Sequence, residues 1–227
     1  MVKPGGLRRD GGEVLDELRA DILAGRLAPG TRLKFSELTQ RLECSVASLR
    51  EALIALSGEW LVQAERNRGF RVTPVSPEAL VDLGEVRVDL ETTALRRAIE
   101  RGGPAWEMGV LQAQHELEAV PLTEVEGGPI AQLWYERHER LHQVLLSGCG
   151  NGRLLSMADT VRSGFEVYWR ALEPLPRGST DQLNAEHRAI VLPALARQAD
   201  TAVEALKVNI LATLAPMLDA LRAGSRA

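Results

Sequence analysis

The sequence of 227 residues has only two cysteines and no long uncharged apolar run. Cys44 and Cys149 are too few and too far apart in sequence to indicate a disulfide framework, and this is typical of a reducing cytoplasm. No uncharged apolar stretch approaches the ~18 residues needed to cross a bilayer, and residues 1–9 lack the apolar segment of a secretion signal. We therefore expect a cytoplasmic protein without a membrane partner.

Neither acidic nor basic residues dominate the chain, but the two signs are unevenly distributed. Taken for the whole chain, the formal net charge of −4 argues against nucleic acid as a partner. Residues 1–74 carry 12 Lys and Arg against 10 Asp and Glu, a net charge of +2, whereas residues 75–227 carry 15 against 21, a net charge of −6. The acidity belongs to the second part, so the overall charge does not argue against a DNA-binding N-terminal domain.

Two prolines, Pro74 and Pro77, mark a domain boundary because neither continues a regular element. From there on, apolar residues recur at helical spacing and no segment alternates as a strand does. We expect a flexible stretch 1–12, a domain at 13–74, a linker at 75–77 and an all-helical domain at 78–224. The predicted helices of this last domain cover about 78–101, 106–119, 130–147, 154–172, 181–196 and 200–221.

The N-terminal domain is predicted to contain three helices and a hairpin. The helices cover 13–23, 36–42 and 46–57, the last capped by Ser45, and two segments with strand character, 61–64 and 70–73, follow. Between them lies a polar tip with Arg66 and Arg68. This order is typical of a winged helix–turn–helix, whose second motif helix enters the major groove.

Side chains at the start of the third helix suit DNA. Hydroxyls of Ser45 and Ser48 and the free backbone amides of the first turn fit phosphate oxygens, and Arg50 can reach phosphate or a guanine edge. Arg66 and Arg68 could follow the backbone or enter the minor groove. The alternative is a small packed module with a solvated basic hairpin.

Residues 13–73 resemble the GntR family of bacterial transcription regulators. The resemblance rests on Leu49-Arg-Glu-Ala-Leu53 and on Arg68-Gly-Phe-Arg-Val72. It implies contact with an operator, and we assign DNA binding to Ser45, Val46, Ser48, Arg50, Arg66, Arg68 and Gly69. Val46 departs from the family, which usually has an arginine there, so the operator consensus is expected to differ.

The second domain resembles FCD, the all-helical ligand-binding domain of the FadR branch of that family. Glu85–Glu91, Leu141–Leu155 and Glu186–Ile190 carry the likeness, and the run from Trp134 to Gly150 is most similar to the CsiR group. The resemblance implies a small carboxylate effector, and a dicarboxylate is one candidate. We assign its binding to Arg87, Arg162 and Asn209; for Arg87 an ion pair with a neighbouring helix is the open alternative.

Three histidines indicate a metal site. His138 and His142 are four residues apart and share a helix face, which suits two ligands of one Zn²⁺-like divalent cation. The FCD resemblance implies His187 as a further ligand. By the same resemblance, His138 occupies a metal-ligand position where FCD domains usually have an aspartate, and Asn209 occupies the position of their last histidine ligand. Hydrogen-bonded histidines without metal are the alternative.

The segment His138-Glu-Arg-Leu-His142 also matches H-E-x-x-H, in which Glu139 would be the general base of a zinc hydrolase. The extended motif fails because Leu145 and Gly148 occupy its later positions. Another alternative is a helical scaffold whose winged domain binds protein. We favour a homodimeric, ligand-responsive repressor of operator DNA that is not an enzyme.

Overall fold

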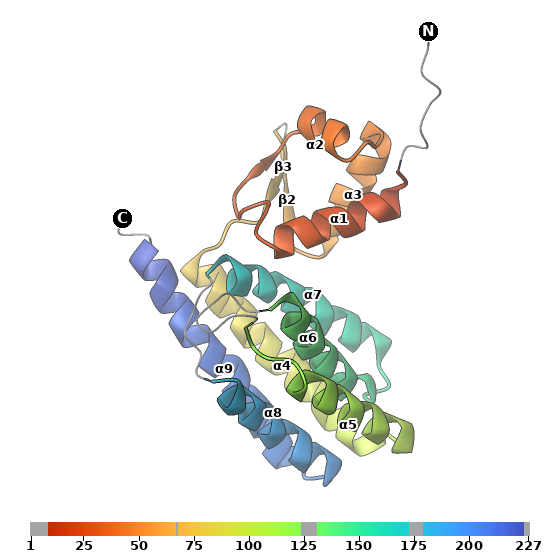
Figure 1. Ribbon diagram of the computed structural model, residues 1–227, viewed down its shortest axis with the longest axis vertical. Coiled ribbons are helices and arrows are strands. Elements are labelled where there is room, and N and C mark those ends of the chain that lie inside the picture. The colour runs from red at the N-terminus through yellow and green to blue at the C-terminus, as the bar shows by residue number, and fades with distance from the viewer. Residues whose placement is uncertain (1–8, 67, 124–130, 173–178, 225–227) are drawn as a thin grey trace. The chain divides into compact units, whose positions relative to one another are not determined.

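The computed structural model describes residues 9–66, 68–123, 131–172 and 179–224 (Figure 1). It divides into two compact units, one of residues 1–79 with 160–171 and the other of residues 80–159 with 172–227. The described elements are mostly helices, with one small sheet. The predicted fold class, a winged helix–turn–helix followed by a helical bundle, is confirmed.

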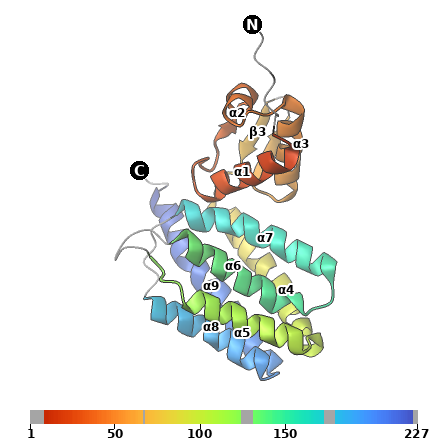
Figure 2. The same cartoon turned by 45° about the vertical axis from the view of Figure 1, so that its right-hand side comes forward.

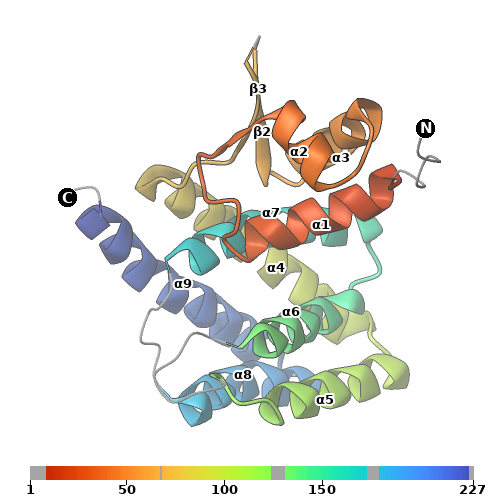
Figure 3. The ribbon, with the colours of Figure 1, turned by 45° about the horizontal axis from the view of Figure 1, so that its top comes forward.

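The winged helix–turn–helix follows the predicted order with one added strand. Its elements are α1 (Gly11–Leu23), β1 (Arg32–Leu33), α2 (Phe35–Arg41), α3 (Val46–Gly58), β2 (Val62–Glu65) and β3 (Gly69–Val72). The antiparallel sheet has the order β1-β3-β2, and its β2–β3 hairpin stands out from the helices in Figure 3. The short β1 was not predicted because two residues are too few to show alternation.

Local capping and apolar spacing explain these elements. The Asp10 carboxylate accepts a hydrogen bond from the Glu13 amide at 2.9 Å, and the Ser45 hydroxyl accepts one from the Ser48 amide at 3.0 Å. These bonds satisfy amides that have no partner within α1 and α3. Buried residues from helices and sheet then form one core, which includes Val14, Leu18, Leu49, Leu53, Leu56, Phe70 and Val72.

The remaining described elements are all helices, as predicted. They are α4 (Pro77–Arg101), α5 (Pro104–Glu118), α6 (Gln132–Ser147), α7 (Gly152–Ala171), α8 (Thr180–Leu195) and α9 (Ala199–Gly224). Figures 1 and 2 show α8 beside α9 and α5 beside α6. Their buried faces include Leu95, Val110, Leu117, Leu141, Leu145, Ile190 and Leu206. The start predicted for the third bundle helix, residue 130, lies outside the described residues.

Helix α9 is the most apolar of the bundle helices by composition. Its stretch Ala199–Arg222 is long and apolar enough to cross a membrane by length and composition alone. However, Ala202, Leu206 and Ile210 are buried, and α9 packs along α8. These residues show that one face of α9 is buried in the bundle, whereas Val208 and Leu211 are exposed.

Candidate functional site

The first candidate site is the exposed start of α3. Val46 and Arg50 are exposed, whereas Ser45 and Ser48 are half-buried. The Ser45 and Ser48 hydroxyl oxygens lie 2.9 Å apart and hydrogen-bond to each other, and the Ser45 hydroxyl also caps the helix. The Arg50 guanidinium lies 5.3 Å from the centre of the Phe35 ring, in cation–π contact. This contact holds the guanidinium beside Phe35, the first residue of α2.

The wing forms a second basic surface of the same unit. Arg66, Arg68 and Gly69 are exposed, and Gly69 has φ of +91°, a conformation that favours glycine. Arg32, on β1, donates to the Arg68 carbonyl at 2.9 Å. We did not predict Arg32 because its proximity to the wing depends on the pairing of β1 with β3.

The second candidate site is a triad of histidines. His138 and His142 come from α6 and His187 from α8, and one ligand nitrogen of each lies within 4.8 Å of the others. His142 and His187 are buried, and His138 is half-buried. Among the described residues that could ligate a metal, this group alone brings three ligand atoms together, and Glu139 is not part of it. The predicted meeting of these histidines is therefore observed.

Neighbouring groups orient two of the three imidazoles. The His187 Nδ1 donates to the Leu183 carbonyl at 2.7 Å, which leaves the buried Nε2 as the lone-pair nitrogen, without a hydrogen-bond partner among the described residues. Burial lowers the pKa of His187 to about 4, so its ring is neutral at physiological pH. The Trp134 ring stacks on His138 with centroids 4.8 Å apart and planes at 13°.

A buried ion pair lies next to the triad. The Arg87 Nε donates to the Glu91 carboxylate at 2.8 Å, and both side chains are buried. The other carboxylate oxygen of Glu91 lies 4.0 Å from His142 Nδ1. Arg87 thus pairs within its own helix, whereas we considered a partner on a neighbouring helix. The i,i+4 spacing of Arg87 and Glu91 is the sequence signal for this pair.

The other two predicted effector residues are buried as well. The Asn209 amide, on α9, donates to the Glu186 carboxylate at 3.4 Å. Arg162, on α7, is 6 % exposed and lies in the part of that helix that belongs to the first compact unit.

Two family models match the chain. Residues 11–72 match "Bacterial regulatory proteins, gntR family", and residues 82–212 match "FCD domain". The chain belongs to the GntR family of bacterial transcription regulators. The predicted GntR domain and FCD domain are therefore confirmed. The family implies operator DNA as partner of the N-terminal domain and a small-molecule effector for the FCD domain.

Known regulators resemble this one along most of their length. The HTH-type transcriptional regulator BphR of Paraburkholderia xenovorans is 34 % identical over 194 residues, 85 % of this chain and 79 % of that protein. The repressor GlaR of Escherichia coli is 29 % identical over 211 residues, 92 % and 95 % of the two chains. The solved structure of E. coli McbR/YncC has a TM-score of 0.73 at 17 % identity, over 91 % and 96 % of the chains, and supports the fold.

Family membership decides between the enzymatic and regulatory interpretations of His138-Glu-x-x-His142. FCD regulators of the GntR family are not enzymes, and the chain is therefore not a zinc hydrolase. The Glu139 carboxylate accepts a hydrogen bond from Gln143 at 3.2 Å, one turn along α6. The finer likeness to the CsiR group is not confirmed by these comparisons.

Proposed function

We propose that this regulator is a homodimeric, cytoplasmic repressor that a small carboxylate releases from its operator, with a divalent cation bound by the histidine triad. The observation that carries the metal site is the triad itself, with three ligand nitrogens within 4.8 Å. The name of GlaR, a repressor, supports the direction of control.

The donor set fits a Zn²⁺-like cation. All three groups are imidazoles, a ligand type that zinc and similar metals accept. A buried nitrogen without a hydrogen-bond partner, His187 Nε2, is costly unless something binds it. The hydrogen bond from His187 Nδ1 to Leu183 fixes the ring as outer-shell partners of metal ligands do.

In this proposal the chain provides three protein ligands, and the effector completes the site. A bound cation would supply a positive centre for a carboxylate oxygen. The buried guanidinium of Arg87 and the amide of Asn209 are the proposed further contacts for the effector, together with Arg162. The Glu91 carboxylate pairs with Arg87 and borders His142.

Operator binding is proposed for the α3 residues Ser45, Val46, Ser48 and Arg50 and for the wing residues Arg66, Arg68 and Gly69. Residues 13–74 are taken as the DNA-binding domain, 75–77 as the linker and 78–224 as the effector domain. A carboxylate can shift operator affinity only if it binds the DNA-competent and the DNA-incompetent arrangement of the dimer with unequal affinity. Such couplings are typically ~1–3 kcal/mol.

A thermal-shift screen of mono- and dicarboxylates tests this function. We expect a dicarboxylate to raise the melting temperature of Zn²⁺-loaded protein, with a smaller rise after EDTA treatment, since binding to the folded state stabilises it. The same compound should release the protein from operator DNA selected from random fragments. A compound that binds equally well with and without EDTA would exclude the metal from effector binding.

A further inference from the structure

The helical unit contains a pocket that no predicted site includes. It has a volume of about 720 Å³, within the range of small-molecule sites, and it is open to solvent. Three arginines line it: Arg97 and Arg101 at the end of α4, and Arg153 at the start of α7. Gly150, Asn151, Gly152 and Ser156 complete its lining. We call it the arginine pocket; all its residues lie in one compact unit.

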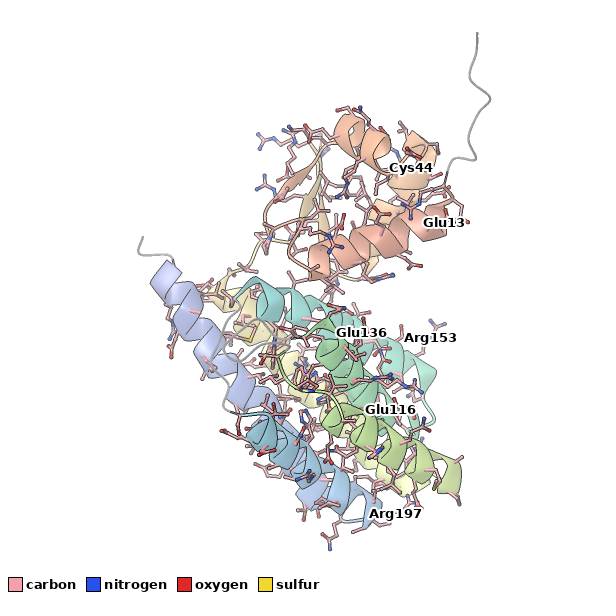
Figure 4. The ribbon with its side chains drawn as sticks, in the orientation of Figure 1. Glu13, Cys44, Glu116, Glu136, Arg153 and Arg197 are labelled. Carbon is pink, nitrogen blue, oxygen red and sulfur yellow. The ribbon has the colours of Figure 1, made fainter. Side chains whose placement is uncertain are left out.

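The positive charge of the arginine pocket is not neutralised. Its lining includes no carboxylate, and neither Arg97 nor Arg153 has an ion pair within the described part of the chain. The adjacent Arg96, by contrast, pairs with Asp200 at 2.7 Å. Figure 4 labels Arg153 on α7. Because guanidinium groups stay protonated, the pocket holds three positive charges at any physiological pH.

The backbone holds one of these three charges in place and adds donors. Arg101 Nη1 donates to the Cys149 carbonyl at 3.0 Å, which ties its guanidinium to the turn before α7. The Asn151 side chain caps α7 by accepting from the Leu154 amide at 3.1 Å. The backbone amides of Gly152 and Arg153, which precede Leu154 in the first turn of α7, have no acceptor among the described residues. Such amides bind anion oxygens.

We propose that the arginine pocket binds a phosphate-bearing small molecule, as a second ligand separate from the carboxylate at the histidine triad. A phosphate group offers several oxygens and about two negative charges, which suits the fork-shaped donors of several arginines. The volume exceeds that of one phosphate, so an organic group attached to it also fits. The proposal does not depend on the proposed metal site, with which it shares no residue.

Calorimetric titration of the full-length regulator with phenyl phosphate tests the proposal, at constant ionic strength. Benzoate, which carries the same ring on a carboxylate, is the ligand control. The double variant Arg97→Gln/Arg153→Gln removes two pocket charges, and Arg96→Gln is the matched control on the same helix. We expect wild type and the Arg96 variant to bind phenyl phosphate, and the double variant to bind at least tenfold more weakly.

Several results would overturn the proposal. One is that wild type does not bind phenyl phosphate at millimolar concentration. Another is that the double variant binds phenyl phosphate as tightly as wild type does. A third is that wild type binds benzoate as tightly as phenyl phosphate. If the double variant instead loses affinity for operator DNA and keeps that for phenyl phosphate, the charges serve nucleic acid. Circular dichroism of the variants checks folding. His142→Ala should bind phenyl phosphate as wild type does, which separates this site from the triad.

Discussion

His187 differs from the other two histidines of the triad in how its ring is held. His138 and His142 share one face of α6 because they are one helical turn apart. His187 comes from α8, and its hydrogen bond to Leu183 directs Nε2 away from its own backbone. A single side chain from another helix therefore turns a pair of histidines on α6 into a cluster of three.

Metal content should depend on His142. We expect purified wild type to contain close to one divalent cation per chain, and His142→Ala to lose at least about tenfold in metal affinity, since loss of an outer-shell partner alone can cost that much. His115, exposed on α5, provides the matched control His115→Ala, which should keep the metal. Elemental analysis measures the metal content of each protein, and titration with Zn²⁺ measures the affinity. Absence of metal from wild type would remove the site.

Arg50 provides the corresponding test of the DNA interface. We expect Arg50→Ala to weaken binding to a selected operator by about 1–3 kcal/mol if the side chain reaches a base edge. A phosphate contact would instead lower affinity for all sequences similarly. Fluorescence anisotropy with operator and scrambled DNA distinguishes the two, and Arg96→Ala is the control outside the winged domain. Unchanged operator affinity would contradict the assignment of α3.

At the scale of elements, glycines decide how closely helices approach at the corner between α4 and α5. A Cβ atom on Gly102 would lie 2.5 Å from the Trp106 ring and 2.6 Å from the Ala98 carbonyl oxygen. A Cβ on Gly148 would meet the same ring at 3.0 Å. The indole Nε1 of Trp106 donates to the Val144 carbonyl at 3.1 Å, so the ring cannot easily move. Close packing of α4, α5 and α6 requires both glycines.

Gly102→Ala should therefore destabilise the regulator by about 1–3 kcal/mol, as overpacking typically does. Gly109→Ala, inside α5, is the control: its Cβ would meet only Val144 at 3.4 Å, an ordinary contact. That variant should be neutral or more stable by up to about 1 kcal/mol, because alanine favours helix. Urea unfolding measures both variants. Equal stability of the two would show that the corner relaxes freely.

At the scale of the whole molecule, charge is divided by function. The N-terminal 74 residues carry a net charge of +2, while the remainder carries −6. The basic side chains Arg50, Arg66 and Arg68 are exposed on the winged domain, where phosphates would neutralise them. The acidic remainder includes the FCD domain, which is not the DNA-binding domain.

Operator binding should need two chains and low salt. A symmetric dimer offers two recognition helices to two half-sites, so we expect two chains per operator in multi-angle light scattering. Affinity should fall steeply between about 50 and 200 mM salt, because released counterions drive binding. A DNA fragment with one half-site is the control and should bind more weakly. One chain per operator at full affinity would contradict the dimer.

Much of the fold could be predicted from the sequence because its signals are local. Ser45 and the prolines at 74 and 77 mark helix starts, and apolar spacing gave every described helix of the bundle to within a few residues. Strand β1 could not be predicted, since Arg32 and Leu33 form it only by pairing with Arg71 and Phe70 of β3. For the same reason Arg32 was missed at the wing.

The sequence by itself determined the family, the order of the elements and the shared face of His138 and His142, because periodicity and capping act over a few residues. Only the tertiary structure decided which distant groups meet. It brought His187 to the other histidines, Glu91 to both Arg87 and His142, and the arginines of α4 to the start of α7. Such meetings depend on how helices pack, which no local pattern specifies.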